Sequence, residues 1–277
     1  MTDAQPATGF VDVPGAQLYY EAVGTGPALV MVHAGIANLR MWDAQAAALS
    51  SRYRVIRYDT RGFGRSRTLD DRLFANYDDL AAVMDHVEVK RAHMLGCSRG
   101  GMITLDFMLE HPERALSLTW VCSGVSGLEY TPTDADAHVV AIFAQMEAAY
   151  EAKDLERLNE LEAQVWVEGP GQPDGRADPQ VRQQVLEMNR LNIIRDDPDL
   201  VAKKLEPPAI GRLAEVKVPV LVIIGDLDMP DSLAAADYME QHVAGARKVV
   251  FHGTAHVPSL ERPEEFNRVV GEFLDSV

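Results

Sequence analysis

The chain contains several runs that are apolar at almost every position, and such runs predict strands buried on both faces. Strands of this kind occur in parallel sheets that lie between two layers of helices. With two shorter β-type segments near the start, the predicted strands are 10–13, 17–22, 28–33, 53–58, 92–96, 116–122, 218–225 and 246–252. Between several of them lie helical patterns, notably 77–87, 101–112 and 263–277. The alternation predicts an α/β fold with a mostly parallel, doubly wound, eight-stranded sheet.

The alternation of strands and helices stops after Gly124. From about residue 127 to residue 213 no strand-like run appears, and apolar residues recur at helical spacing instead. The two stripes consist of Val139, Ile142, Phe143, Met146 and Tyr150, and of Val181, Val185, Met188 and Leu191. We therefore expect an α/β core formed by residues 1–126 and 214–277, with a helical cap inserted at 127–213. Such an insertion commonly covers the C-terminal edge of the sheet, where open α/β folds bind their ligands.

Composition and charge narrow the class of protein further. The 277 residues are 47% hydrophobic and 25% charged, which suits a globular protein with a sizeable core. A formal net charge of −16 argues against nucleic acid and anionic membranes as partners. Two cysteines are too few for a disulfide framework or a zinc cluster, and we expect neither a metal nor another cofactor. Because we find no signal peptide and no membrane-spanning run, we expect a cytoplasmic protein.

Ser98 stands between two glycines, in the pattern Gly96-x-Ser98-x-Gly100, after a predicted strand and before a predicted helix. A sharp strand-to-helix turn holds such a serine in a strained conformation, so its neighbours must lack a Cβ. The hydroxyl then projects from the sheet edge at a helix N-terminus, which favours a developing negative charge. The pattern alone is common, but with this strand and this helix it predicts a nucleophile elbow.

A nucleophilic serine needs a base and a third group that orients the base, in the chain order serine, acid, histidine. Asp228 and His256 satisfy this order, and each lies just past a predicted strand, at the sheet edge that carries Ser98. Asp226 and His252 compete with them in the same two loops. Asp226 could simply cap a helix or close a turn, and a histidine at a strand end often satisfies local backbone groups.

The residues reached so far resemble the α/β-hydrolase fold family along essentially the whole chain. The segments that carry the resemblance are "VHAGIANLRMW", "YDTRGFGRS", "GCSRGG", "GDLD" and "GTAHVPSLERPEEF". The resemblance implies that Ser98 is the nucleophile, His256 the base and Asp228 the orienting acid. It is specific for the fold and the triad, and it does not name a substrate.

The resemblance also implies an oxyanion hole. The family uses the backbone N–H of the residue after the nucleophile, here Arg99, and a second N–H from the loop after the third strand, here Gly35. Each such donor is typically worth ~3 kcal/mol. The family usually reads His-Gly in this loop, whereas this chain reads His33-Ala34-Gly35, and we expect His33 to stabilise the loop. The Arg99 side chain either reaches a carboxylate or solvent, or holds an acidic or polar group of the substrate.

The cap is expected to set specificity. Its candidate pocket residues are Phe143, Met146, Tyr150, Trp166 and Met188, of which one or two should touch substrate because such stripes more often form helix–helix core. We expect a serine hydrolase that cleaves small to medium carboxylic esters or lactones through an acyl-enzyme on Ser98. A perhydrolase or cofactor-free haloperoxidase-like activity, a carbon–carbon bond hydrolase and a slow-turnover ligand sensor are the alternatives. The expected partner is a small-molecule ester or lactone, and a homodimer is left open.

Overall fold

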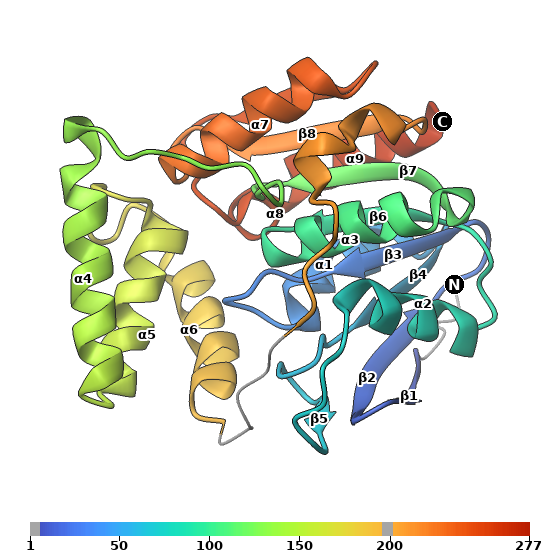
Figure 1. The fold of residues 1–277 in the computed structure, drawn as a ribbon, viewed down its shortest axis with the longest axis horizontal. Helices are drawn as coiled ribbons and strands as arrows, with labels where there is room; N and C mark the ends of the chain where they lie inside the picture. Colours follow the sequence, from blue (N-terminus) through green and yellow to red (C-terminus); the bar gives the residue numbers. More distant parts are fainter. Residues whose placement is uncertain (1–5, 196–201) are drawn as a thin grey trace.

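A mostly parallel sheet forms the centre of the structure, and helices cover both of its faces (Figure 1). The computed structural model describes residues 6–195 and 202–277, within which the sheet has nine strands. They are β1 (Ala7–Val13), β2 (Ala16–Val23), β3 (Ala28–Val32), β4 (Arg54–Tyr58), β5 (Arg67–Thr68), β6 (Ala92–Cys97), β7 (Ala115–Val121), β8 (Val220–Gly225) and β9 (Arg247–Phe251). The eight predicted strands are confirmed, and the two-residue β5 adds a ninth.

The strand order places the ends of four successive strands side by side. The order is β1-β2-β4-β3-β6-β7-β8-β9, with β5 paired to β2. The pairs that involve β2 are antiparallel and the other pairs are parallel. Every residue of β6 and β8 is buried, as expected for apolar strands between helices. The loops that follow β6, β7, β8 and β9 therefore meet at one edge of the sheet.

Helices lie between the strands and after the last of them. They are α1 (Asp43–Leu49), α2 (Asn76–His86), α3 (Arg99–Glu110), α4 (Ala137–Glu151), α5 (Leu155–Ala163), α6 (Pro179–Ile193), α7 (Pro230–His242), α8 (Pro258–Glu261) and α9 (Pro263–Asp275). The helices that flank the sheet turn their apolar sides toward it. In α9, for example, Phe266, Val270 and Phe273 recur at helical spacing and are buried. Apolar patterns singled out α2, α3 and α9, whereas α1 and α7 are rich in alanine and give a weaker pattern. None of the helices that the structure describes has the length and apolar character needed to cross a bilayer.

The turn from β6 into α3 is tight because α3 approaches the sheet closely. A Cβ on Gly100 would lie 2.1 Å from the backbone oxygen of Val32 in β3, and a Cβ on Gly96 would lie 2.2 Å from the backbone oxygen of Gly100. Between them, Ser98 adopts φ 53° and ψ −121°, a conformation that non-glycine residues rarely take. The structure thus has the strand, strained turn and helix that the sequence predicts around Ser98.

The helices α4, α5 and α6 form a separate layer beside the sheet, in the segment that joins β7 to β8 (Figure 1). They pack in sequence order, α4 against α5 and α5 against α6. A small apolar cluster links this layer to the sheet edge, since Val139 of α4 packs with Val165 and with Met229 of the loop after β8. In the described part of this segment, the only strand-like pairing is an isolated bridge between Phe74 and Ala202.

The predicted apolar stripe on α4 is only partly buried, and this is a correction. Val139 is buried, and Ile142 and Met146 pack toward α5, where Leu158 and Leu161 lie. Tyr150 is 67% exposed and Phe143 is 38% exposed. The helix is apolar on nearly all sides, and among the described helices it packs mainly against α5, so part of its apolar surface faces outward.

The close approach of α3 to β3 predicts a large cost for any side chain at Gly100. We expect Gly100→Ala to lower the free energy of unfolding by about 2–4 kcal/mol, because backbone atoms must move to admit the methyl group. The measurement is urea unfolding, compared with Gly211→Ala. Gly211 is exposed and a Cβ there meets no atom within 4 Å, so this control should change stability by about 0.5 kcal/mol or less. Equal unfolding midpoints for the two variants would contradict the packing argument.

Candidate active site

The backbone of Ser98 is fixed between β6 and β7. Its N–H donates to the backbone oxygen of Val121 at 2.9 Å, and its own oxygen accepts from Gly101 N at 2.8 Å. The Ser123 hydroxyl donates to the same oxygen at 2.5 Å. These bonds hold the strained residue in place, and its side chain is half-buried at the N-terminus of α3. The backbone of Ser98 is thus fixed at the sheet edge where the sequence predicts a nucleophile.

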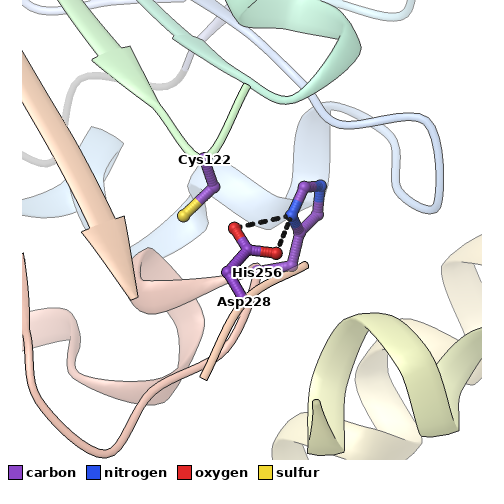
Figure 2. Close-up of side chains that lie close together, drawn as sticks. All are labelled: Cys122, Asp228 and His256. Carbon is purple, nitrogen blue, oxygen red and sulfur yellow. Dashed lines mark hydrogen bonds and ion pairs between the residues drawn. The ribbon is translucent and has the colours of Figure 1, made fainter. Parts of the chain in front are cut away.

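Asp228 and His256 form a buried hydrogen-bonded pair (Figure 2). His256 Nδ1 lies 2.8 Å from Asp228 Oδ1 and 3.0 Å from Asp228 Oδ2, and both residues are 3% exposed. Asp228 Oδ1 also accepts from the backbone N–H of Met229 at 2.7 Å. The carboxylate therefore favours the tautomer with the proton on Nδ1, which leaves Nε2 free to accept a proton.

The competing residues pair with each other at the surface. His252 Nδ1 lies 2.9 Å from Asp226 Oδ2, and Asp226 Oδ1 accepts from the backbone N–H of Gly253 at 2.7 Å. The His252 side chain is 84% exposed, so this pair is in contact with water and stabilises the turn after β9. Of the two aspartates and two histidines that the sequence left in competition, the structure buries Asp228 and His256.

The residue before Ser98 contacts the backbone of His256. The Cys97 thiol donates to the backbone oxygen of His256 at 3.6 Å. Between the side chains of Ser98 and His256 themselves, the described chain shows no hydrogen bond. Nucleophile–base distances are often long without substrate and shorten in the complex.

The two predicted oxyanion-hole residues are neighbours. A Cβ on Gly35 would lie 4.0 Å from the Cβ of Arg99, so the loop after β3 faces the start of α3. Arg99 is the first residue of α3, and its N–H has no acceptor within the helix. The Gly35 N–H donates to no backbone acceptor among the described residues. The backbone of Gly35 thus lies close to the residue that follows Ser98.

His33 ties the loop after β3 to the loop after β4. Its Nδ1 donates to the backbone oxygen of Ala34 at 2.8 Å, and its Nε2 accepts from the backbone N–H of Thr60 at 3.0 Å. The Thr60 hydroxyl lies 3.1 Å from the same Nε2. The ring is fully buried, and burial lowers its pKa to about 3, so His33 is neutral at physiological pH. This is the loop-stabilising role that the sequence suggested.

One of the cap candidates lies against the Asp–His pair. Trp166, in a π-helical turn (Gln164–Glu168), has its ring centroid 4.5 Å from that of His256, and its backbone oxygen accepts from His256 N at 3.2 Å. Phe143 meets the outer side of Trp166 edge-on at 6.3 Å. Met146 packs between α4 and α5, and Met188 is fully buried in the main core. Tyr150 lies on the exposed side of α4, away from this cluster.

Cys122 is a neighbour of the pair that the motifs did not single out for a role (Figure 2). It directly follows β7 in a left-handed conformation with φ 45°, and its sulfur lies within 4.8 Å of the possible ligand atoms of Asp228 and His256. Burial raises the pKa of the thiol well above its ordinary value, so it stays protonated. The thiol is thus a buried, uncharged neighbour of the Asp228–His256 pair.

Comparison with known proteins identifies the family. A family model described as the alpha/beta hydrolase fold matches residues 27–263. The chain belongs to this family. It is similar to the pimeloyl-acyl-carrier-protein methyl ester esterase of Nitrosomonas europaea, with 30% identity over 260 residues, 91% of this chain and 97% of the relative. It is also similar to 3-oxoadipate enol-lactonase 1 of Acinetobacter baylyi, with 24% identity over 100% of this chain and 97% of the relative.

A solved structure supports the same assignment. The crystal structure of a hydrolase from Pseudomonas aeruginosa PA01 matches with a TM-score of 0.75 and 26% identity, over 96% of this chain and 98% of that one. The relatives are esterases, lactonases and other hydrolases, and this α/β-hydrolase is likewise an enzyme of the hydrolase class.

The buried neutral His33 predicts an acid-sensitive component of stability. The ordinary pKa of histidine is 6.5 and that of His33 in the folded chain is about 3. Below the ordinary value the unfolded chain binds a proton that the folded chain does not, so stability falls as the pH is lowered toward the folded value. We expect His33→Gln to be less stable at neutral pH but to lose about 1–2 kcal/mol less than the parent by about pH 5. Parallel pH profiles of the free energy of unfolding would contradict this.

Proposed function

We propose that the protein is a serine hydrolase that cleaves small to medium carboxylic esters or lactones through an acyl-enzyme on Ser98. The observation that carries the proposal is the buried Asp228–His256 pair at the sheet edge where Ser98 is held in a strained turn. The order along the chain is the one the fold requires. The methyl ester esterase and the enol-lactonase to which the chain is similar act, by their names, on an ester and a lactone.

In the first half of the reaction, Ser98 Oγ attacks the carbonyl carbon while His256 Nε2 takes the hydroxyl proton. The carbonyl oxygen becomes negative and accepts hydrogen bonds from the N–H groups of Gly35 and Arg99. The alcohol then leaves with the proton from His256, and the acyl group stays on Ser98 as an ester. For a lactone the alcohol is the other end of the same molecule.

In the second half, His256 takes a proton from water, and the resulting hydroxide equivalent attacks the acyl carbon. The Ser98 oxygen leaves with the proton from His256, and the free acid is released. Asp228 takes no proton in either half. It holds the ring in the tautomer that exposes Nε2 and stabilises the positive ring that forms at each proton transfer.

We infer that residues 127–213 form a cap over this edge of the core, which consists of residues 1–126 and 214–277. The contact that supports this division is the packing of Trp166 on His256, which brings the inserted segment to the proposed base. An indole over the ring excludes water from one side of the Asp–His pair and strengthens its electrostatic interaction. We propose Trp166 as a pocket wall; Phe143 lies behind it as the next layer.

The proposal predicts different effects for the two aspartates that follow β8. On a p-nitrophenyl ester series from acetate to decanoate and on lactones, we expect Ser98→Ala to lower kcat by at least ~10³-fold and Asp228→Asn by ~10²–10⁴-fold. Asp226→Asn is the matched control, because Asp226 lies two residues away in the surface pair, and it should stay within about twofold. Hydrolysis that survives in Ser98→Ala, or an equal loss in both aspartate variants, would contradict the assignment.

A further inference from the structure

The charged end of Arg99 is partly buried and has no carboxylate partner among the described residues. Its Nη1 donates to the Thr60 hydroxyl at 2.5 Å and its Nη2 donates to the Asn76 side-chain oxygen at 2.8 Å. The guanidinium also lies over the ring of Phe63, at 4.6 Å from the centroid. All three partners are neutral, and the other N–H groups of the guanidinium have no acceptor among the described residues.

Arg61, a fully buried arginine nearby, shows how a buried guanidinium is usually paired. Arg61 donates from Nε and Nη2 to both carboxylate oxygens of Asp79, at 3.0 and 2.9 Å. Buried charges in proteins are normally paired in this way, because an unpaired charge loses its hydration without compensation. Asp79 is thus engaged by Arg61 and acts on Arg99 only at longer range.

Burial lowers the pKa of the Arg99 side chain but does not remove its positive charge. It lowers the pKa of the guanidinium to about 10, and the group keeps its positive charge at neutral pH. The site therefore holds a full positive charge with unused donors, at the residue that follows the proposed nucleophile. An anion that enters would find the guanidinium already oriented by Thr60, Asn76 and Phe63.

Arg99 opens onto a cavity that such an anion could occupy. The cavity has a volume of about 670 Å³ and lies between the start of α2, one side of α3 and residues 202–208. Apolar side chains such as Met102, Ile103 and Leu205 form part of its wall. The volume is in the range of small-molecule sites, and an apolar wall with few polar groups is typical of them.

Other charged groups also face this cavity. Lys203 and Lys204 lie on its exposed side, and Glu206 lies beside them. Asp106, two turns along α3 from Arg99, has its pKa raised to about 7 by burial, so it is largely neutral in slightly acidic solution and partly neutral near pH 7. The arginine end is the part of the cavity closest along the chain to Ser98.

We propose that this cavity is a carboxylate subsite in which Arg99 binds an acidic group of the substrate while Ser98 attacks the ester or lactone carbonyl. The inference rests on the proposed serine-hydrolase function. A planar guanidinium binds carboxylates through paired N–H groups, and an enclosed site strengthens this interaction. The preferred substrates are then monoesters of dicarboxylic acids, or lactones with a free carboxylate, rather than neutral esters of the same length.

The test compares matched acidic and neutral esters. The acidic probes are the monomethyl esters of dicarboxylic acids from succinate to suberate, and the neutral probes are methyl esters of the monocarboxylic acids of equal chain length. The subsite predicts that the parent enzyme has a higher kcat/KM for the acidic probe at one or more lengths. In Arg99→Met the ratio of acidic to neutral kcat/KM should fall about tenfold or more, mainly through KM, and Arg99→Lys should recover part of it.

The ratio is the readout because both variants keep the Arg99 backbone N–H, while loss of the Thr60 bond can disturb the loop and lower turnover of every ester. Arg40→Met is the control for net charge, since Arg40 is exposed and lies outside the cavity lining. It should leave the ratio within about twofold. A ratio near one in the parent enzyme, or a ratio unchanged by Arg99→Met, overturns the subsite.

A binding measurement separates failure of the subsite from failure of the proposed function. Adipate and its neutral dimethyl ester are titrated calorimetrically into Ser98→Ala, which needs no turnover. Adipate binding that Arg99→Met abolishes in this background supports the subsite even if none of the esters is a substrate, in which case the serine-hydrolase proposal fails alone. Ester hydrolysis that requires Ser98, together with no adipate binding and an unaltered ratio, overturns the subsite alone. If Arg99→Met and Arg99→Lys do not fold, the acidic-to-neutral kcat/KM ratio of the parent enzyme and adipate binding to Ser98→Ala still test the subsite.

Discussion

The close contact between α3 and the sheet at Gly100 is the constraint on which the arrangement of the site depends. With no side chain at this position, the helix comes close enough that a Cβ would lie 2.1 Å from the Val32 backbone. The chain can then turn from β6 into α3 within a few residues, with Ser98 strained between two glycines. The same contact brings the start of α3 to the loop after β3, where Gly35 faces Arg99. Backbone packing thereby brings the proposed nucleophile close to the two residues proposed for the oxyanion hole.

Burial distinguishes the two Asp–His pairs at this edge. Both pairs have a histidine Nδ1 about 2.8–2.9 Å from a carboxylate oxygen, so distance alone does not separate them. His252 and Asp226 are in water, where such a pair is weak and readily exchanged. His256 and Asp228 are enclosed by the strand ends, by Cys122 and by Trp166, so the ring has one orientation and its free nitrogen one direction. That fixed orientation is what a general base requires.

The amino-acid sequence predicts the features that depend on local pattern. The apolar runs mark the eight main strands, and the two glycines around Ser98 indicate the turn, because both follow from local sterics and burial. The short β5 pairs through its backbone and leaves no apolar pattern. The partly exposed face of α4 depends on which elements pack against the helix, and the spacing of apolar residues does not predict that packing. The surroundings of Arg99 come from Thr60, Phe63 and Asn76 in separate segments, so its missing counter-charge becomes visible only in the folded chain.

The central claim is that Ser98 forms a covalent bond during the reaction, and a labelling experiment tests it most directly. A fluorophosphonate ester should attach one phosphonyl group per chain, with loss of fluoride, and peptide mapping by mass spectrometry should place it on the peptide that contains Ser98. Labelling should be much slower in His256→Ala, which lacks the proposed base. A label on a different residue, or a folded parent enzyme that takes up none, would contradict the account.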